Sequence, residues 1–483
     1  MYTVFFAQNN SECMNSNQVN NAAPDKLLFY AFCALLVWLP LPFGSYRPWA
    51  WSIMEIWIYT IAASWCWLYF RNKVTVSSSL RSARFVLLIF VLWLVFIALQ
   101  LTPLSAQIIH VLSPLAFEHW SPIAEPVLTI DLKATRVYWL LSLAYVLVFF
   151  LALVLITNRK RLKTMAYTLV FSGLFQAMYG AVMTLSTLEY SFFIKKQYFI
   201  GVATGTFIGR NHLAGYLEMT IAIGIGLLIA SMGMTYGETV KKKALNILRL
   251  LLSAKARLRV SLIIMVIALV LTHSRMGNTA FFVSLFIAGV IGLVFSKYST
   301  RSVVILLVSL VIIDILIVGQ WFGLEKVKQR LEQTSFVTEN RDEVNIHALR
   351  QWQDYRLTGS GLGSFYTVFP QYRGDDIRSY NYQMHNDYLQ FATDTGVIGI
   401  VLLGLITVTS LCAALLAQYR RRDPLMRGMS FASIMGIIAI LIHSSVDFNL
   451  QIPANAATFV ILLALAWISL SLGRRESKSV VSD

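Results

Sequence analysis

Charged residues are scarce in this chain of 483 residues: Asp, Glu, Lys and Arg together make up 13% of the sequence, while 57% is hydrophobic. An ordinary soluble protein has about 25% charged residues. This chain therefore has too little polar surface to cover a water-exposed globule, and its mean hydropathy of +0.64 points the same way. The composition excludes soluble, collagen-like and disordered proteins and indicates an integral membrane protein.

Cysteine is also scarce, with four residues in the chain. Cys33, Cys66 and Cys412 lie within apolar runs, and Cys13 lies in a polar N-terminal segment. None is placed where an external disulfide could form, which excludes a disulfide-stapled fold. Because no Cys or His cluster has the spacing of a metal site, the sequence predicts neither a metal nor another cofactor.

Twelve apolar runs are candidates for crossing the hydrocarbon core of a bilayer, which takes about 20 helical residues, and the seventh is too short unless flanking residues extend it. They are residues 27–43, 50–70, 85–101, 137–156, 165–185, 213–234, 260–271, 279–295, 303–322, 388–417, 428–445 and 456–472. The predicted fold class is therefore an all-α polytopic membrane protein with about 12 transmembrane helices.

The segments between these runs define the predicted domain organisation. Residues 1–26 are polar and lack the basic start of a signal peptide, so they are predicted to form a disordered cytoplasmic tail. Spans one to nine occupy 27–322, a long external loop occupies 323–387, spans ten to twelve occupy 388–472, and a second cytoplasmic tail occupies 473–483. A connection as long as the external loop is expected to carry structure or function.

The net charge of +16 raises the possibility of a nucleic-acid partner, but the basic residues are not spread evenly. The two tails and alternate connections between spans hold 25 of the 40 basic residues and 6 of the 24 acidic ones, and the rest of the chain nets −3. This asymmetry is the positive-inside pattern. It predicts that both termini lie in the cytoplasm, and it leaves no reason to expect nucleic acid. The family resemblance described below implies that the membrane is the bacterial inner membrane.

Two features stand out in the long external loop. Residues 337–355 predict a short amphipathic helix, whose apolar stripe comprises Val344, Ala348, Leu349 and Trp352. The glycine-rich segment 359–365 follows it. Such glycines allow backbone N–H groups to approach an anion, so the segment is either a phosphate-binding turn or a flexible turn between two helices.

His385 follows in the same loop, just before the tenth span, with Asn386 and Asp387 as neighbours. A histidine titrates near neutral pH, and a carboxylate can orient it and stabilise its protonated form, as a general base requires. A histidine that only caps a helix or sits at the membrane interface is the alternative interpretation.

Arg210 and Arg275 are predicted to lie at the same external interface, directly before the sixth span and between the seventh and eighth. A charge at this depth is costly and is usually paired or functional. Arginine also presents a planar fork that suits phosphate oxygens. The two arginines therefore predict an anionic substrate, with membrane anchoring as the alternative role.

Four further polar residues lie near or inside spans. Glu218 and Asp314 fall within spans and are expected to pair with the arginines or face a polar cavity. His443 and Asp447 are four residues apart, which places them on one helical face. We interpret this spacing as structural pairing rather than catalysis.

Together these segments resemble the O-antigen ligase and O-antigen polymerase superfamily, which includes bacterial O-linked oligosaccharyltransferases. The residues that carry the resemblance are Arg210-Asn211-His212-Leu213-Ala214-Gly215, Ser274-Arg275-Met276-Gly277, Arg341, Gly359-Ser360-Gly361-Leu362-Gly363-Ser364-Phe365, His385-Asn386-Asp387-Tyr388-Leu389-Gln390 and Gly396-Val397-Ile398-Gly399. Their order, spacing and shared side of the membrane make the set more specific than any single motif.

The resemblance implies a metal-independent glycosyltransferase of the GT-C type, working at the periplasmic face of the membrane. Its donor would be a glycan on undecaprenyl diphosphate, and its acceptor would be lipid A-core, another glycan or a protein hydroxyl. By analogy His385 would be the catalytic base and Arg210 and Arg275 would bind the diphosphate. Arg341, Arg350 and Asn386 would contribute further substrate contacts.

Two other classes of protein stay open at this point. A transporter of lipid-linked glycans would place charges along a path through the membrane. A scaffold in an envelope assembly would not depend on His385. The polar residues gather at one membrane face, which favours surface chemistry over transport.

Overall fold

The computed structural model describes residues 23–121, 125–232, 254–295, 341–375, 377 and 383–473. Within this part of the chain, nine helices are long and apolar enough to cross a membrane. They are α2 (Pro48–Phe70), α4 (Arg84–Leu101), α7 (Leu132–Leu155), α8 (Arg159–Leu185), α9 (Arg210–Met232), α12 (Arg275–Val294), α17 (Asp387–Arg420), α18 (Pro424–His443) and α19 (Pro453–Ser471). The predicted all-α polytopic membrane fold is confirmed.

Two more helices occupy predicted spans without meeting these criteria. Helix α11 (Ala254–Leu271) carries three basic residues in its first two turns. Helix α1 (Lys26–Trp38) has 13 residues and ends earlier than predicted, because Pro40 and Pro42 follow and proline cannot continue a helix. The ninth predicted span, 303–322, lies outside the described residues.

Short elements connect the long helices. They are η1 (Phe43–Ser45), α3 (Ser78–Ser82), α5 (Ala106–Leu112), α6 (Pro114–Trp120), β1 (Tyr190–Ser191), β2 (Ile194–Lys195), α15 (Arg341–Asp354), α16 (Phe365–Val368), η4 (Phe369–Gln371) and η5 (Asn449–Gln451). Strands β1 and β2 form a small antiparallel hairpin, with Tyr190 opposite Lys195.

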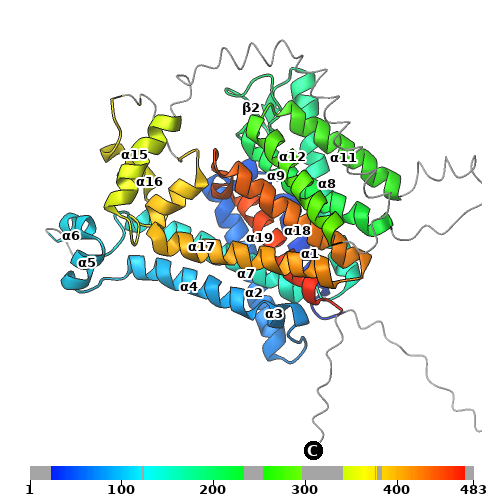
Figure 1. Ribbon diagram of the computed structural model, residues 1–483, viewed down its shortest axis with the longest axis horizontal. Coiled ribbons are helices and arrows are strands. Elements are labelled where there is room, and N and C mark those ends of the chain that lie inside the picture. The colour runs from blue at the N-terminus through cyan, green and yellow to red at the C-terminus, as the bar shows by residue number, and fades with distance from the viewer. Residues whose placement is uncertain are drawn as a thin grey trace, which may run out of the picture.

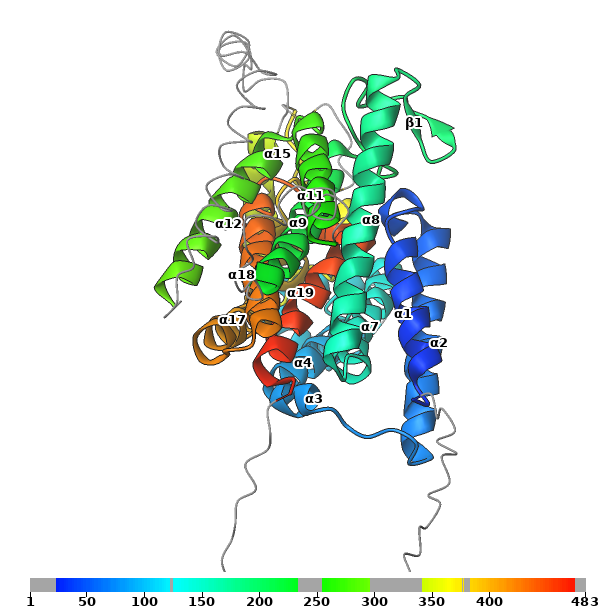
Figure 2. The ribbon, with the colours of Figure 1, turned by 90° about the vertical axis from the view of Figure 1, so that its right-hand side faces the viewer.

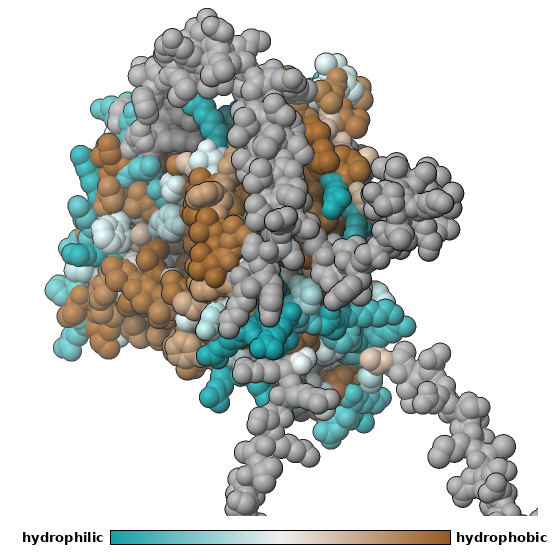
Figure 3. Space-filling model, turned by 45° about the vertical axis from the view of Figure 1, so that its right-hand side comes forward, coloured by the Kyte–Doolittle hydropathy of each residue, from teal (hydrophilic) through white to brown (hydrophobic). Residues whose placement is uncertain are grey.

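The bundle has two distinct ends. The start of α1 and the end of α19 lie at the end that also carries α3, while the β1–β2 hairpin and α15 lie at the opposite end (Figures 1 and 2). Figure 3 shows apolar surface flanked by hydrophilic residues on both sides. This pattern is expected of a protein whose apolar belt faces lipid.

Helices α9, α18 and α19 form the centre of the bundle, with 89%, 78% and 89% of their apolar windows buried. Helices α9 and α18 cross in close contact at two glycines: a Cβ on Gly226 would lie 2.3 Å from the carbonyl oxygen of Gly428, and a Cβ on Gly428 would lie 2.1 Å from that of Gly226. Without the hydrophobic effect to drive association in lipid, such close backbone approach is a main source of helix packing. This crossing fixes the start of α9 beside the end of α18.

Helix α17 has 34 residues and is broken at Gly396, where φ is +61° and ψ is −165°. A side chain there would clash with the Leu357 carbonyl, since a Cβ would lie 2.4 Å from its oxygen. The backbone N–H groups of Val397 and Ile398 donate to the carbonyls of Arg356 and Leu357. The break thus ties the first two turns of α17, which follow His385, to the segment after α15.

Helix α15 confirms part of the amphipathic prediction. Val344 and Ala348 are buried and belong to one apolar cluster with Phe365 and Phe369. Leu349, which we predicted on the same stripe, is instead 44% exposed. Leu349 lies at the edge of the stripe, where a side chain can be either buried or exposed. The buried stripe of α15 is therefore narrower than predicted.

Gly226→Ala should destabilise the protein by about 1–3 kcal/mol, because the new methyl group would overlap a backbone carbonyl of α18 that cannot move independently. Gly404→Ala is the matched control, since a Cβ at Gly404 meets nothing within 4 Å. Thermal unfolding of the purified protein in detergent measures the difference. Equal unfolding temperatures for the two variants would contradict the close crossing.

Candidate functional site

A buried carboxylate, that of Asp447, lies at the centre of a polar cluster at the end of the bundle that carries α15. Its Oδ1 lies 3.4 Å from Nδ1 of His385 and 4.0 Å from Nε2 of His212. Its Oδ2 accepts a hydrogen bond from the side-chain amide of Asn211. The Asp447 side chain is 1% exposed, whereas that of His385 is 37% exposed. A buried acid thus lies beside one ring nitrogen of a histidine that solvent or a substrate can reach.

Phe448 separates the two histidines of this cluster. Its ring centroid lies 4.7 Å from that of His212 and 5.0 Å from that of His385, and both contacts are edge-to-face. The Phe448 backbone N–H donates to Oδ1 of Asp447 at 2.8 Å. The turn that carries the acid therefore also supplies the apolar wall that restricts both imidazole rings.

Asp447 is ionised in this setting. Burial pushes the pKa of its carboxyl upward, but the contact with His385 and the positive charge that His212, His385 and His443 can carry outweigh burial, and the pKa falls below its ordinary value. An ionised carboxylate beside Nδ1 favours the tautomer that keeps its proton on Nδ1, and it stabilises the imidazolium that forms when Nε2 takes up a proton.

The carboxylate of Asp387, the sequence neighbour of His385, has a different role. Its Oδ2 accepts hydrogen bonds from the Ser444 hydroxyl at 2.8 Å and from the Leu450 backbone N–H at 3.0 Å. The Asp387 backbone N–H donates to the carbonyl of Ser444 at 2.9 Å. Asp387 therefore fastens the turn that contains Asp447 to the start of α17, and Asp447 is the acid that contacts His385.

From their spacing we predicted that His443 and Asp447 pair on one helical face. The structure shows a different arrangement. Helix α18 ends at His443, so the four-residue spacing no longer places the two side chains on one face. Nδ1 of His443 instead lies 2.8 Å from Oε1 of Glu218, and both side chains are fully buried. Glu218 was predicted to pair with the arginines or to face a polar cavity, but its partner is His443. The other acid predicted inside a span, Asp314, lies outside the described residues.

Arg210 and Arg275 are the first residues of α9 and α12. Arg210 is half-buried and directly precedes Asn211, which donates to Asp447. Helix α12 begins beside α9, because a Cβ at Gly277 would lie 2.7 Å from Cβ of Ala214. Two helix N-termini, each with an arginine at its first position, thus lie at the Asp447 end of α9. Helix N-termini and arginine both favour bound anions.

The remaining predicted site residues lie on α15 and directly before α17. Arg341 begins α15, and Arg350 is exposed on the same helix. Asn386 caps α17 through its Oδ1, which accepts the backbone N–H of Leu389 at 3.1 Å. Asn211 and His212 belong to the sequence motif but were not predicted as site residues, and their position directly after Arg210 was the available signal.

The glycine-rich segment 359–364 is neither a phosphate-binding turn nor a flexible turn. All six of its backbone N–H groups donate within the protein, and the acceptors are the carbonyls of Tyr355, Thr393, Asp394 and Gly361, the amide of Gln100 and the carboxylate of Asp394. Glycine is needed because a Cβ at Gly359, Gly361 or Gly363 would lie 1.9–2.3 Å from a neighbouring atom. The segment is a packing junction between α4, α7 and α17.

Comparison with known families supports this organisation. Residues 260–404 match the model of a family described as O-antigen ligase. The chain carries a domain of the O-antigen ligase superfamily. The matched segment starts in α11 and ends in α17, so it includes Arg275 and His385. A search of curated proteins finds no match to this chain.

An apolar cavity of about 440 Å³ adjoins the site. Asp387, Tyr388 and Ser444 line it at the level of the Asp447 turn. Side chains of α4, α7, α17 and α19 line the rest, among them Trp93, Tyr145, Leu403 and Phe459. The cavity is predominantly apolar and extends between membrane-spanning helices.

Within the described residues, no three His, Cys, Asp or Glu side chains are grouped as metal ligands. The polar cluster consists of the Asp447 carboxylate, the imidazoles of His212 and His385, and the side-chain amide of Asn211. These groups can move a proton and, with Arg210 and Arg275, neutralise a negative charge.

Gly359→Ala should lower stability more than Gly201→Ala, although both glycines have φ of +73°. The left-handed backbone costs each alanine about 1 kcal/mol. Only at Gly359 does the new Cβ also meet another backbone, at 2.3 Å from atoms of Asp394 and Thr395, while nothing lies within 4 Å of it at Gly201. Thermal unfolding tests this, and two equally stable variants would show that the junction is loose.

Proposed function

We propose that this protein is a glycosyltransferase of the ligase type, which moves a glycan from undecaprenyl diphosphate to an acceptor hydroxyl at the periplasmic face of the inner membrane. The observation that carries the proposal is the contact between His385 and the buried carboxylate of Asp447. The positive-inside pattern supports cytoplasmic termini, which puts the His385 cluster on the periplasmic side.

His385 serves as the general base in this proposal. Asp447 holds Nδ1, so Nε2 is the nitrogen that accepts the proton of the acceptor hydroxyl. The acceptor oxygen then forms a bond to the anomeric carbon of the donor sugar, the bond from that carbon to the diphosphate oxygen breaks, and the electron pair leaves with the diphosphate. Asp447 stabilises the imidazolium that results.

Arg210 and Arg275 stabilise the leaving diphosphate. Negative charge grows on the bridging oxygen as the glycosidic bond breaks, and fixed cations at a partly dehydrated site stabilise that charge strongly. The N-termini of α9 and α12 add partial positive charge in the same place. Arg341, Arg350 and Asn386 are proposed to contact the sugar or phosphate groups as a second set.

The apolar cavity is proposed to hold part of the undecaprenyl chain. A lipid-linked donor must present its diphosphate to the polar cluster while its hydrocarbon stays out of water. The cavity of about 440 Å³ meets this requirement, because it is lined by Asp387 and Ser444 beside the Asp447 turn and by apolar side chains elsewhere.

Lipid A-core is the proposed acceptor, supported by the description of the matching family as O-antigen ligase. Members that lengthen a glycan or glycosylate a protein would use the same base and the same donor. The acceptor is identified by the product lost from a strain that lacks the gene: lipid A-core without its long glycan, glycan without chain lengthening, or unglycosylated protein.

His385→Ala and Asp447→Asn should each lower the transfer rate by about 10² or more, because the first removes the base and the second removes the charge that stabilises its protonated form. His110→Gln is the matched control, an exposed histidine on α5. The measurement is glycan incorporation by complemented deletion strains with equal amounts of membrane-inserted protein. Wild-type incorporation by His385→Ala would exclude the general base and favour transport or a scaffold.

Arg210→Lys and Arg275→Lys should also impair transfer, by about tenfold or more, since lysine keeps the charge but cannot form bidentate contacts to phosphate oxygens. The two substitutions should lower the transfer rate measured with excess donor, and they should leave the amount of membrane-inserted protein unchanged. Transfer at the wild-type rate by both lysine variants would mean that the arginines only anchor the helices.

A further inference from the structure

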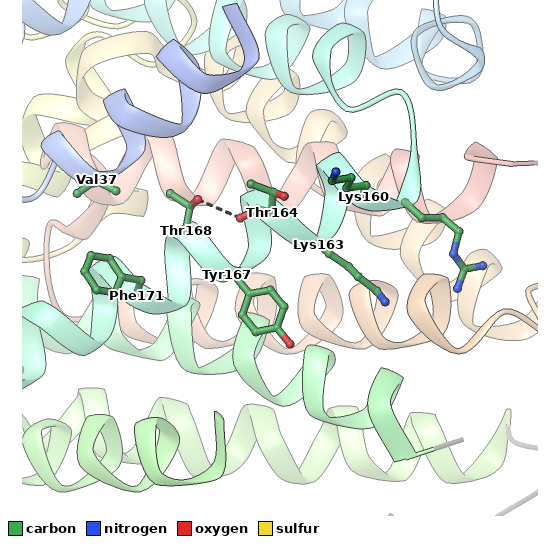
Figure 4. A pocket seen from close by; sticks show the side chains of 8 residues that line it. Val37, Lys160, Lys163, Thr164, Tyr167, Thr168 and Phe171 are labelled. Atoms are coloured by element: carbon green, nitrogen blue, oxygen red, sulfur yellow. Dashed lines mark hydrogen bonds between the residues drawn. The ribbon is translucent and has the colours of Figure 1, made fainter. Parts of the chain in front are cut away.

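A groove is lined by residues of α1 and α8 that are of two opposite kinds, basic and apolar (Figure 4). Figure 2 shows the two helices side by side. The groove encloses about 700 Å³ and is lined by Val37, Arg159, Lys160, Lys163, Thr164, Tyr167, Thr168 and Phe171. Lys160 and Lys163 lie at one end, and Val37 and Phe171 lie at the other (Figure 4). The groove therefore changes from cationic to apolar along its length.

The length of the groove matches one leaflet of a bilayer. Arg159 and Phe171 are twelve residues apart on α8, which corresponds to about 18 Å of helix. Half of a bilayer's hydrocarbon core is about 15 Å thick. The basic residues thus reach the level of the lipid headgroups when Phe171 lies near the middle of the membrane. Tyr167 and Phe171, which are 44% and 60% exposed, then lie at the level of the acyl chains of that leaflet.

The basic end has more positive charge than its acidic neighbours neutralise. Arg159 contacts the carboxylate of Asp423. The described residues contain no ion pair between Lys160 or Lys163 and a carboxylate, and the first turn of α8 has no acidic residue. The helix N-terminus adds partial positive charge. A nearby buried pair, Arg161 with Asp25 at 2.7 Å, ties α8 to the start of α1 and is not part of the groove lining.

We propose that this groove binds an anionic phospholipid, with its phosphate at Lys160 and Lys163 and an acyl chain along Tyr167 and Phe171. Basic pockets between transmembrane helices bind acidic headgroups in this way, and an apolar floor of leaflet depth suits a lipid rather than a free anion. The site lies in the leaflet on the side where α1 begins and α19 ends. It does not rest on the proposed glycosyl transfer.

The test is lipid binding by the purified full-length protein, measured by native mass spectrometry with dioleoyl phosphatidylglycerol or dioleoyl phosphatidylcholine. The protein should retain phosphatidylglycerol preferentially, and Lys160→Gln/Lys163→Gln should weaken its binding by about tenfold. The matched control is Lys73→Gln/Arg259→Gln, which removes the same charge from exposed positions elsewhere. Lys160→Arg/Lys163→Arg should restore binding.

A measurement on the unmodified chain keeps the proposal testable if a variant fails to fold. In nanodiscs of phosphatidylglycerol, an amine-reactive reagent should label Lys160 and Lys163 several-fold less than in nanodiscs of phosphatidylcholine, relative to Lys73 in the same sample. Equal protection of Lys73 would reduce the effect to membrane surface potential and overturn the site. Displacement of the lipid by millimolar inorganic phosphate would overturn it as well, because the groove would then be a site for a free anion.

Discussion

The ionised carboxylate of Asp447 is the group on which the arrangement of the polar site depends. A buried charge costs several kcal/mol unless it is paired. Its pairing partners come from separate parts of the chain: Asn211 and His212 from α9, and His385 from the segment before α17. Satisfying one charge therefore brings together elements that are far apart in sequence. The close crossing of α9 and α18 at Gly226 and Gly428 determines where these elements meet.

The polar network extends from Asp447 into the core of the bundle. Glu218 and His443 form a fully buried pair between α9 and α18, and Asn455 of α19 donates to the backbone carbonyl of His212 at 3.0 Å. Each of the three central helices thus makes at least one polar contact near the site. Polar contacts inside a membrane bundle have few competing partners, so they orient the central helices as well as stabilise them.

The fold class could be predicted from the sequence, because apolar runs of helix length are visible in the order of the residues. The charge asymmetry also assigns a membrane side to the polar residues, and that side stays a prediction. The sequence also singles out His385 and the two arginines, because charged or titratable groups at a membrane boundary are conspicuous, and their roles stay predictions. It did not identify Asp447 as the partner of His385, since the spacing argument assumed that α18 continues past His443. The role of segment 359–364 was also missed, because its backbone acceptors come from helices distant in sequence. Contacts of that kind are not visible in local patterns.

The shortness of α1 has a consequence for the backbone that follows it. Thirteen helical residues span about 20 Å, whereas the hydrocarbon core is about 30 Å thick. Irregular backbone follows α1, and there the Ser45 hydroxyl donates to the Leu39 carbonyl and the Thr206 hydroxyl donates to the Pro40 carbonyl, both at 2.7 Å. Lipid hydrocarbon offers a carbonyl no hydrogen bond, so these contacts let the chain leave the helix early without exposing those two carbonyls to the bilayer.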